Sequence, residues 1–143
     1  MVERVVMFTH STGSPHTASI ADDLVRDGRL AIPVGWYSGW SDPALGSNVL
    51  EVGSNYCIEA ANAVSFLAET HQQQFGELPT IALATDAGDY GQDSAAGAKL
   101  AAAQLGVEIT FDGEATLAFG SDPTEVAGAI ATSTADYTWL ATD

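Results

Sequence analysis

The sequence contains a single cysteine and very few basic residues. With only Cys57 present, a disulfide within the chain and a cysteine zinc cluster are both excluded. Lys and Arg together number 4 among the 143 residues, against 19 Asp and Glu, which gives a formal net charge of −15. A surface of this charge repels phosphate backbones and anionic lipids, and no basic patch offsets it. We therefore expect no nucleic-acid partner, and we interpret the acidity as serving solubility or salt tolerance.

Long apolar runs are also missing. The longest apolar stretches fall far short of the roughly 20 residues that a membrane-spanning helix needs, so we expect no direct membrane insertion by these residues. No basic stretch followed by an apolar segment opens the sequence, and we expect no secretory signal within it. The chain is nevertheless 46% hydrophobic and 16% charged, a composition typical of globular proteins, and its length suffices for one ordinary domain with a core.

The motifs of catalysis and of cofactor binding are absent as well. His10 and Ser11 are residue types used in nucleophilic catalysis, but adjacent residues rarely face one another and no Gly-x-Ser-x-Gly elbow is present. His16 follows His10 without a carboxylate at ligand spacing, and His71 lies in a polar stretch typical of a solvated helix end. No predicted strand leads into Gly-x-Gly-x-x-Gly. We expect no catalytic residue, no metal and no cofactor.

The rest of the chain is organised around residues 80–94. The mostly apolar run Thr80–Thr85 predicts a buried strand of a parallel sheet, although periodicity alone does not distinguish it from a buried helix. A helix follows from about Tyr90, with Asp86 or Asp89 available to cap it. Ligands of open α/β sheets bind outside the carboxyl ends of the strands. The side chain of Tyr90 is accordingly either a ligand contact or a surface group packed on its own helix.

Strands and helices alternate along the remaining sequence. Further strands are predicted at about 2–9, 30–34, 107–111 and 137–141, with a short extended piece at 49–52, and helices at about 14–27, 54–73, 91–105 and from 122 onward. This alternation predicts an α/β fold with mainly parallel sheets and right-handed crossovers. A parallel sheet needs helices on both faces, and the predicted elements do not supply them all. We therefore expect incomplete sheets.

Two stretches of the sequence resemble a known family. They contain the loop His10-Ser11-Thr12-Gly13-Ser14-Pro15 within 5–43, and Asp89-Tyr90-Gly91 after a strand, followed by an alanine-rich helix, Gly106-Val107-Glu108 and Ser121-Asp122-Pro123. Together they resemble the leucine/branched-chain amino-acid type of ABC-transporter solute-binding protein. The likeness covers nearly the whole chain.

The resemblance implies a periplasmic-binding-protein type 1 fold, in which two three-layer α/β lobes hold a ligand in the cleft between them. Proteins of this type are considerably more than twice as long as this chain, so the resemblance implies a fragment with two incomplete lobes. It assigns 1–75 to part of the first ligand-binding lobe, 76–79 to a hinge crossing and 80–143 to part of the second ligand-binding lobe.

The function implied by the resemblance is that of the extracytoplasmic solute-binding component of an ABC importer. Such a protein binds a small polar ligand, for instance an amino acid or an amide, without catalysis. Its partner is a membrane permease, and its location is periplasmic or extracellular and membrane-associated. Two alternatives stay open: a ligand-sensing domain of a receptor or regulator with the same fold, and a free-standing α/β enzyme.

Three loops supply the ligand contacts that the resemblance implies: His10, Ser11 and Thr12; Trp36, Ser38, Trp40 and Ser41; and Tyr90. A helix that starts just after the first loop would offer free amides and the positive end of its dipole to a carboxylate. The two tryptophans are either an apolar wall of the site or the ordinary packing of a long loop.

Overall fold

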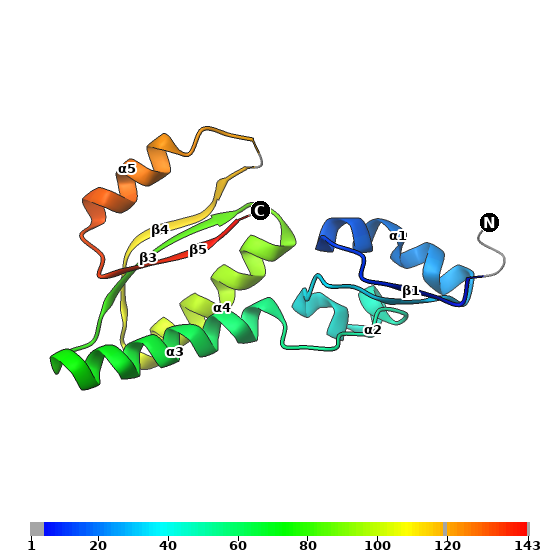
Figure 1. Cartoon of the computed structure of the whole chain (residues 1–143), viewed down its shortest axis with the longest axis horizontal. Helices are drawn as coiled ribbons and strands as arrows, with labels where there is room; N and C mark the ends of the chain where they lie inside the picture. The colour runs from blue at the N-terminus through cyan, green and yellow to red at the C-terminus, as the bar shows by residue number, and fades with distance from the viewer. Residues whose placement is uncertain (1–4, 119, 143) are drawn as a thin grey trace. The chain divides into compact units, whose positions relative to one another are not determined.

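The structure is a computed structural model that describes residues 5–118 and 120–142. The chain divides into two compact units, Met1–Tyr56 and Cys57–Asp143. Figure 1 colours the chain from β1 in the first unit to β5 in the second. Each unit combines helices with a parallel sheet, so the predicted α/β class and the parallel pairing are both confirmed. Among the described residues, no helix has the length and apolar character that crossing a bilayer requires.

The first unit is built on two short parallel strands. Its elements are β1 (Met7–Thr9), α1 (Ser14–Arg26), β2 (Leu30–Ile32), the 3-10 helix η2 (Ser38–Ser41) and α2 (Pro43–Gly46). A single bridge from Ala31 to Val49 extends the sheet, where the sequence predicted a short extended piece. β1 is shorter than the predicted strand at 2–9, and residues 2–4 of that prediction lie outside the described residues. Gly28, with φ +61°, follows the last turn of α1 as expected for a helix end.

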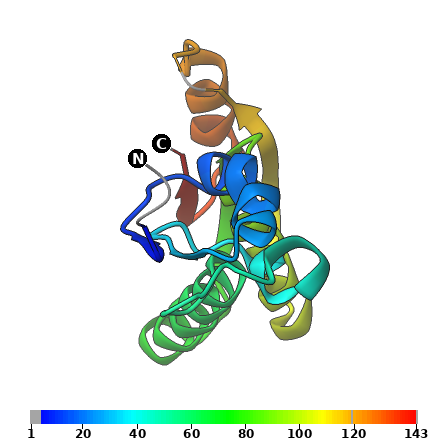
Figure 2. The same cartoon turned by 90° about the vertical axis from the view of Figure 1, so that its right-hand side faces the viewer.

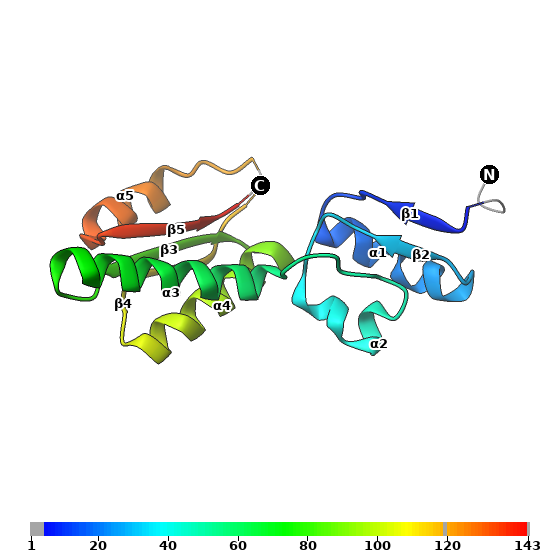
Figure 3. The ribbon, with the colours of Figure 1, turned by 60° about the horizontal axis from the view of Figure 1, so that its bottom comes forward.

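One face of this small sheet is covered and the other is not. β1 and β2 lie side by side with α1 along them (Figure 3). The covered face joins a buried cluster of Leu24, Ala31, Trp40 and Val49, with Phe8, Ile20 and Tyr37 packed against it. Met7 and Leu30, which are partners across the two strands, are 43% and 37% exposed. The first unit is therefore an incomplete layer structure within the described residues.

The second unit has helices on both faces of a three-stranded sheet. Its elements are α3 (Tyr56–Phe75), β3 (Thr80–Asp86), α4 (Asp89–Leu105), β4 (Glu108–Leu117), α5 (Thr124–Ser133) and β5 (Tyr137–Ala141). The strand order is β4-β3-β5, and both pairs are parallel. α3 and α4 lie on one side of the sheet and α5 on the other (Figures 1 and 2). This arrangement has the three layers that the resemblance implies for a lobe.

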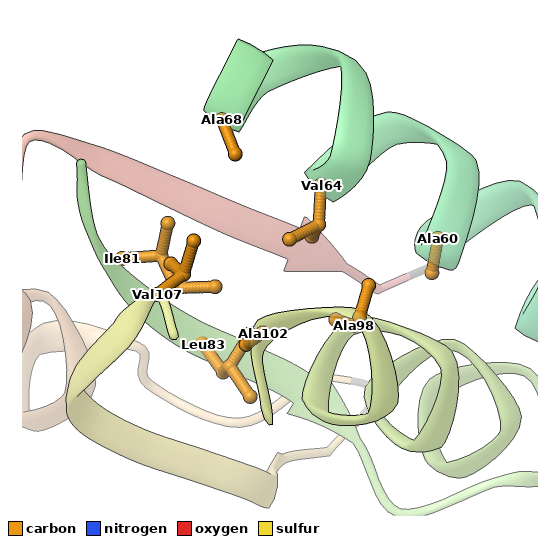
Figure 4. Close-up of a cluster of buried hydrophobic side chains, with 9 residues drawn as sticks. Ala60, Val64, Ala68, Ile81, Leu83, Ala98, Ala102 and Val107 are labelled. Carbon is orange, nitrogen blue, oxygen red and sulfur yellow. The ribbon is translucent and has the colours of Figure 1, made fainter. Parts of the chain in front are cut away.

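The core of the second unit lies between β3 and the two helices α3 and α4. Ile81 and Leu83 of β3 are at most 1% exposed and point into a cluster that includes Val64 of α3 and Ala98 of α4 (Figure 4). Each of these large side chains contributes about 2 kcal/mol through its burial. The alternate residues of β3 are buried as well, so β3 is the doubly covered central strand that its sequence predicts.

A glycine allows α3 and α4 to approach closely. A Cβ atom on Gly97 of α4 would lie 1.9 Å from the carbonyl oxygen of Cys57 in the first turn of α3. At the same contact the Cys57 amide donates a hydrogen bond of 3.3 Å to the Asp93 carboxylate. This bond satisfies one of the free amides that every helix start presents. Gly97 therefore fixes the spacing of the two helices, and Asp93 fixes the start of α3.

The observed division of the chain differs from the predicted division after residue 75. Ala60, Val64 and Ala68 of α3 pack in the core cluster with β3 and α4, so this helix belongs to the second unit. Residues 76–79 connect α3 to β3 inside that unit instead of crossing between units. The sequence shows that these alanines are on one helix face, but it does not show which sheet they pack against.

Candidate functional site

The loop between β1 and α1 is held against the carboxyl end of β2. The His10 amide donates to the Ile32 carbonyl at 2.9 Å, and the Val34 amide donates to the Ser11 carbonyl at 2.9 Å. His10 adopts a left-handed conformation with φ +60°, which is unfavourable for a residue with a side chain. Its imidazole is exposed, as is Thr12, while Ser11 is half-buried. These bonds place the loop where an open α/β sheet binds its ligands.

The N-terminus of α1 holds a hydroxyl group that has no partner. Gly13 is the N-cap, and Ser14 is the first residue of the helix. Ser14 is 1% exposed, and its Oγ makes no hydrogen bond. Leaving a buried hydroxyl unpaired costs about 1–3 kcal/mol. An acceptor that reached this group would recover that cost.

Gly35 packs closely beside this hydroxyl. A Cβ atom at Gly35 would lie 3.1 Å from the Ser14 amide nitrogen and 3.2 Å from Ser14 Oγ, closer than ordinary van der Waals contact. Around the same turn, Ser11 Oγ and Thr17 Oγ1 lie 3.4 Å apart. Ser14 and Gly35 were not among the predicted contacts. The sequence feature that could have indicated them is Gly35, which directly follows the strand predicted at 30–34 and precedes the loop of the two tryptophans.

The two tryptophans of the next loop have different environments. Trp40 is 6% exposed, belongs to the core cluster of the first unit and meets Tyr37 edge-on with ring centroids 5.5 Å apart. Of the two interpretations, ordinary packing therefore describes Trp40, and we no longer assign it to a ligand wall. Trp36 is half-buried, its carbonyl accepts a 2.9 Å bond from the Tyr56 amide, and its ring lies over Gly53. Its role in a wall stays a prediction.

The two serines of this loop lie in η2. Ser38, the first residue of η2, is half-buried. Ser41 is exposed, and its Oγ donates a 3.1 Å hydrogen bond to the Glu51 carboxylate. The Ser41 hydroxyl is thus bonded to an acidic side chain of the same unit, and a ligand would have to compete with that bond. A role for either serine in binding stays a prediction.

Tyr90 lies at the corresponding position of the second unit, just after the carboxyl end of β3. It is the second residue of α4 and is half-buried. The predicted capping by Asp86 or Asp89 is not observed, because Gly88 is the N-cap and no side chain caps the helix. Asp86 instead accepts a 2.6 Å bond from the Gly88 amide, which tightens the turn. A Cβ atom on Gly91 would lie 2.2 Å from the Asp86 carbonyl oxygen, so this turn requires glycine.

Two further titratable residues, His71 and Cys57, have surroundings that are set by the packing of the second unit. His71 is 7% exposed and its Nδ1 lies 3.2 Å from Tyr137 Oη, so the expectation of a solvated helix end is wrong. Burial raises the pKa of the Cys57 thiol, and the nearby Asp93 raises it further, which leaves the thiol protonated. In the described part of the chain, no group of three or more His, Cys, Asp or Glu side chains could hold a metal ion.

The whole chain, residues 1–143, matches the sequence model of a family described as periplasmic binding protein. The chain belongs to this family, and the resemblance noted in its sequence is confirmed at that level. A comparison with curated proteins gave no match.

Solved structures with the same fold include several binding components of ABC transporters. A fatty acid ABC transporter substrate-binding protein from Thermomonospora curvata has a TM-score of 0.72 and 24% identity. The match covers 95% of this chain and 32% of that protein's chain. A branched chain amino acid ABC transporter from Thermus thermophilus with bound valine has a TM-score of 0.72 and 14% identity, covering 95% and 33%. A solute binding protein of an ABC transporter from Rhodopseudomonas palustris HaA2, in complex with p-hydroxybenzoic acid, has a TM-score of 0.78 and 15% identity, covering 98% and 36%. The chain thus spans about a third of the length of these structures, and the likeness shows the fold.

Proposed function

We propose that this chain forms part of an extracytoplasmic solute-binding protein that delivers a small molecule to the membrane permease of an ABC importer. Membership of the periplasmic binding protein family supports this role. The similar solved structures, each described as belonging to an ABC transporter, support it further. The role requires binding and release of a solute without a chemical step.

The observation that carries the proposal is the unpartnered hydroxyl at the start of α1. Ser14 Oγ is buried without a hydrogen bond, and the buried Gly35 packs directly beside it, where any side chain would crowd it. The first turn of a helix of 13 residues adds free amides and the positive end of its dipole. These donors suit a carboxylate, because charge-assisted hydrogen bonds to backbone amides and hydroxyls are the strong ones. Ser11 and Thr12 would add hydroxyl donors from the preceding loop.

We infer that the ligand is a small carboxylate such as an amino acid. Trp36 would contact its apolar part, and Tyr90 would contact it from the second lobe across an interlobe cleft. The ligand would favour the closed state only if it makes contacts there that the open state lacks. Residues at the start of both helices, α1 and α4, would then share one ligand.

Amide chemical shifts of the 143-residue chain test this proposal. The chain is titrated with sodium valinate and, separately, with sodium 4-hydroxybenzoate, in salt that screens the net charge of −15. We expect weak binding, because one loop supplies most of the donors, and we expect the shifts to concentrate at residues 11–17. Gly35→Ala places a methyl group against Ser14 and should weaken that binding about tenfold.

Gly128→Ala is the matched control, because a Cβ atom at Gly128 in α5 meets nothing within 4 Å. Its affinity should equal that of the unmodified chain. Shifts spread away from residues 11–17, or equal affinities for the two variants, would contradict the proposed site.

A further inference from the structure

A histidine side chain lies against the start of α1. A Cβ atom on Gly13, the N-cap of this helix, would lie 2.5 Å from His16 Nδ1 and 3.3 Å from His16 Cε1. His16 is the third residue of α1, so its imidazole reaches back to the cap, while the residue as a whole is exposed. Gly13 has φ +82°, a conformation that also favours glycine. The missing side chain of Gly13 thus gives the ring its place beside the first turn.

This ring neighbours the donors of the candidate site. The Cβ position of Gly35 lies 3.3 Å from the Gly13 carbonyl carbon and 3.2 Å from Ser14 Oγ, so Gly13 is in contact with both the ring and the site. Within the described part of the chain, the only hydrogen bond at His16 outside the helix backbone runs from Ser19 Oγ to its backbone carbonyl, at 2.7 Å. The ring nitrogens of His16 are therefore left for another partner.

Few other titratable groups belong to this part of the first unit. The described elements β1, β2, η2 and α2 contain no charged side chain and no histidine. The charged residues of α1 lie in its later turns, and they are Asp22, Asp23 and Arg26. The charged residues of the described loops are Asp27, Arg29, Asp42 and Glu51, of which the first two follow the opposite end of α1. Among the described residues, His10 and His16 are then the groups that can bring a positive charge to the start of α1.

We propose that the His16 imidazole is a ligand contact that donates a hydrogen bond to the carboxylate bound at the start of α1. This inference rests on the proposed function, and it adds to that site a group whose charge can change. Histidine is the side chain that ordinarily changes its charge between about pH 5 and pH 8. A carboxylate favours the charged ring, because a hydrogen bond between two ions is stronger than one between neutral groups. Ligand capture therefore takes up one proton from solvent onto the ring, and release returns it.

Valine binding to the 143-residue chain at about pH 5.5 and about pH 8, at one fixed salt concentration, tests this role. Neither charge of valine changes over this range, so a change in affinity comes from the protein. We expect the dissociation constant, followed through the amide shifts of residues 11–17, to be about tenfold lower at the acidic pH. At neutral pH, added valine should also move the ring signals of His16 toward those of the charged imidazole.

Three variants separate His16 from the other histidines. His16→Gln keeps a donor that does not titrate, so its affinity should be the same at both pH values. His16→Lys keeps a positive charge at both, so at about pH 8 it should bind valine more tightly than the unmodified chain. His10→Gln, in the loop before α1, should retain the full pH dependence, whatever it does to the affinity itself. Circular dichroism at both pH values establishes that each variant folds.

The outcomes distinguish this inference from the function on which it rests. A pH dependence that His16→Gln leaves unchanged, or that His10→Gln removes, would overturn the role of His16 and leave the proposed carboxylate site standing. If valine moved no amide signal of residues 11–17 at either pH, the site and the inference would both be wrong.

Discussion

Replacement of Gly97 by alanine should destabilise the second unit even though alanine is the better helix former. A Cβ atom at this position would lie 1.9 Å from the Cys57 carbonyl oxygen, about 1.5 Å short of the 3.4 Å at which ordinary contact begins. The obstacle is backbone of α3, so no side-chain rotation relieves it. The two helices have to separate, and the cluster that Val64 and Ala98 share has to loosen.

Three effects set the size of the change in the free energy of unfolding. Overpacking of a well-packed contact costs about 1–3 kcal/mol. Separation of the helices also weakens the hydrogen bond from the Cys57 amide to Asp93, which costs about 1 kcal/mol more. Alanine in place of glycine inside a helix returns about 1 kcal/mol. The net expectation is a loss of about 1–3 kcal/mol, and Gly97→Val should lose more.

Hydrogen exchange of the Ile81 and Leu83 amides measures this loss, because both residues lie in the core of the second unit. The measurement reports on that unit alone, which matters in a chain that divides into two. Gly128→Ala is the control: the new methyl group meets nothing, so this variant should gain up to about 1 kcal/mol. If Gly97→Ala were as stable as Gly128→Ala, the reasoning from helix spacing would be refuted.

Two further predictions concern charge. The thermal midpoint of unfolding should rise with NaCl concentration, because screening reduces the self-repulsion of a chain with net charge −15; a midpoint that stayed constant from low salt to about 1 M would contradict this. The pKa of Asp136 is lowered by hydrogen bonds from the backbone amide and then the hydroxyl of Thr80. Its stabilising contribution is therefore present above the unfolded pKa and lost as pH falls through the lower folded pKa. Below pH 3.8, the usual pKa of an aspartate, the stability of Asp136→Asn should accordingly depend less on pH than that of the unmodified chain. An acid-unfolding curve that the substitution leaves unchanged would count against the stabilising role of this hydrogen bond.

The elements of the second unit could be read from the sequence because their local signals agree. The strand at 80–85 is mostly apolar and corresponds to β3, and the strand at 137–141 has the bounds of β5. Gly106, which directly follows the alanine-rich helix in the sequence, is its left-handed C-cap with φ +76°. Turn residues and apolar runs determine these elements within a few positions, and distant contacts reinforce them.

Features that depend on tertiary packing could not be read in the same way. The division after Tyr56 follows from the side of α3 that packs on β3, and helix periodicity does not identify the partner of a face. His71 lies in a polar stretch, yet the ring of Tyr137, 66 residues further on, covers it. Trp40 and Trp36 are four residues apart in one loop, and only the fold shows that one is core and the other half-buried.

The position of the first loop was predicted, while its role in binding stays a prediction. The sequence indicated the loop of His10, Ser11 and Thr12 before a helix, and that loop is bonded to the end of β2. It did not indicate Ser14 as a ligand contact, because a serine before an apolar helix is usually its N-cap. The lone hydroxyl beside Gly35 becomes visible only when two segments about twenty residues apart are brought together.

The carboxylate of Asp93 has a consequence for the order of folding. It holds the first turn of α3 although it lies 36 residues further along the chain. The first turn of α3 therefore gains this support only after β3 has crossed over and α4 has docked. The start of α3 is therefore coupled to the packing of α4 beside it, whereas the middle of α3 is held by the core cluster that Val64 shares with Ile81.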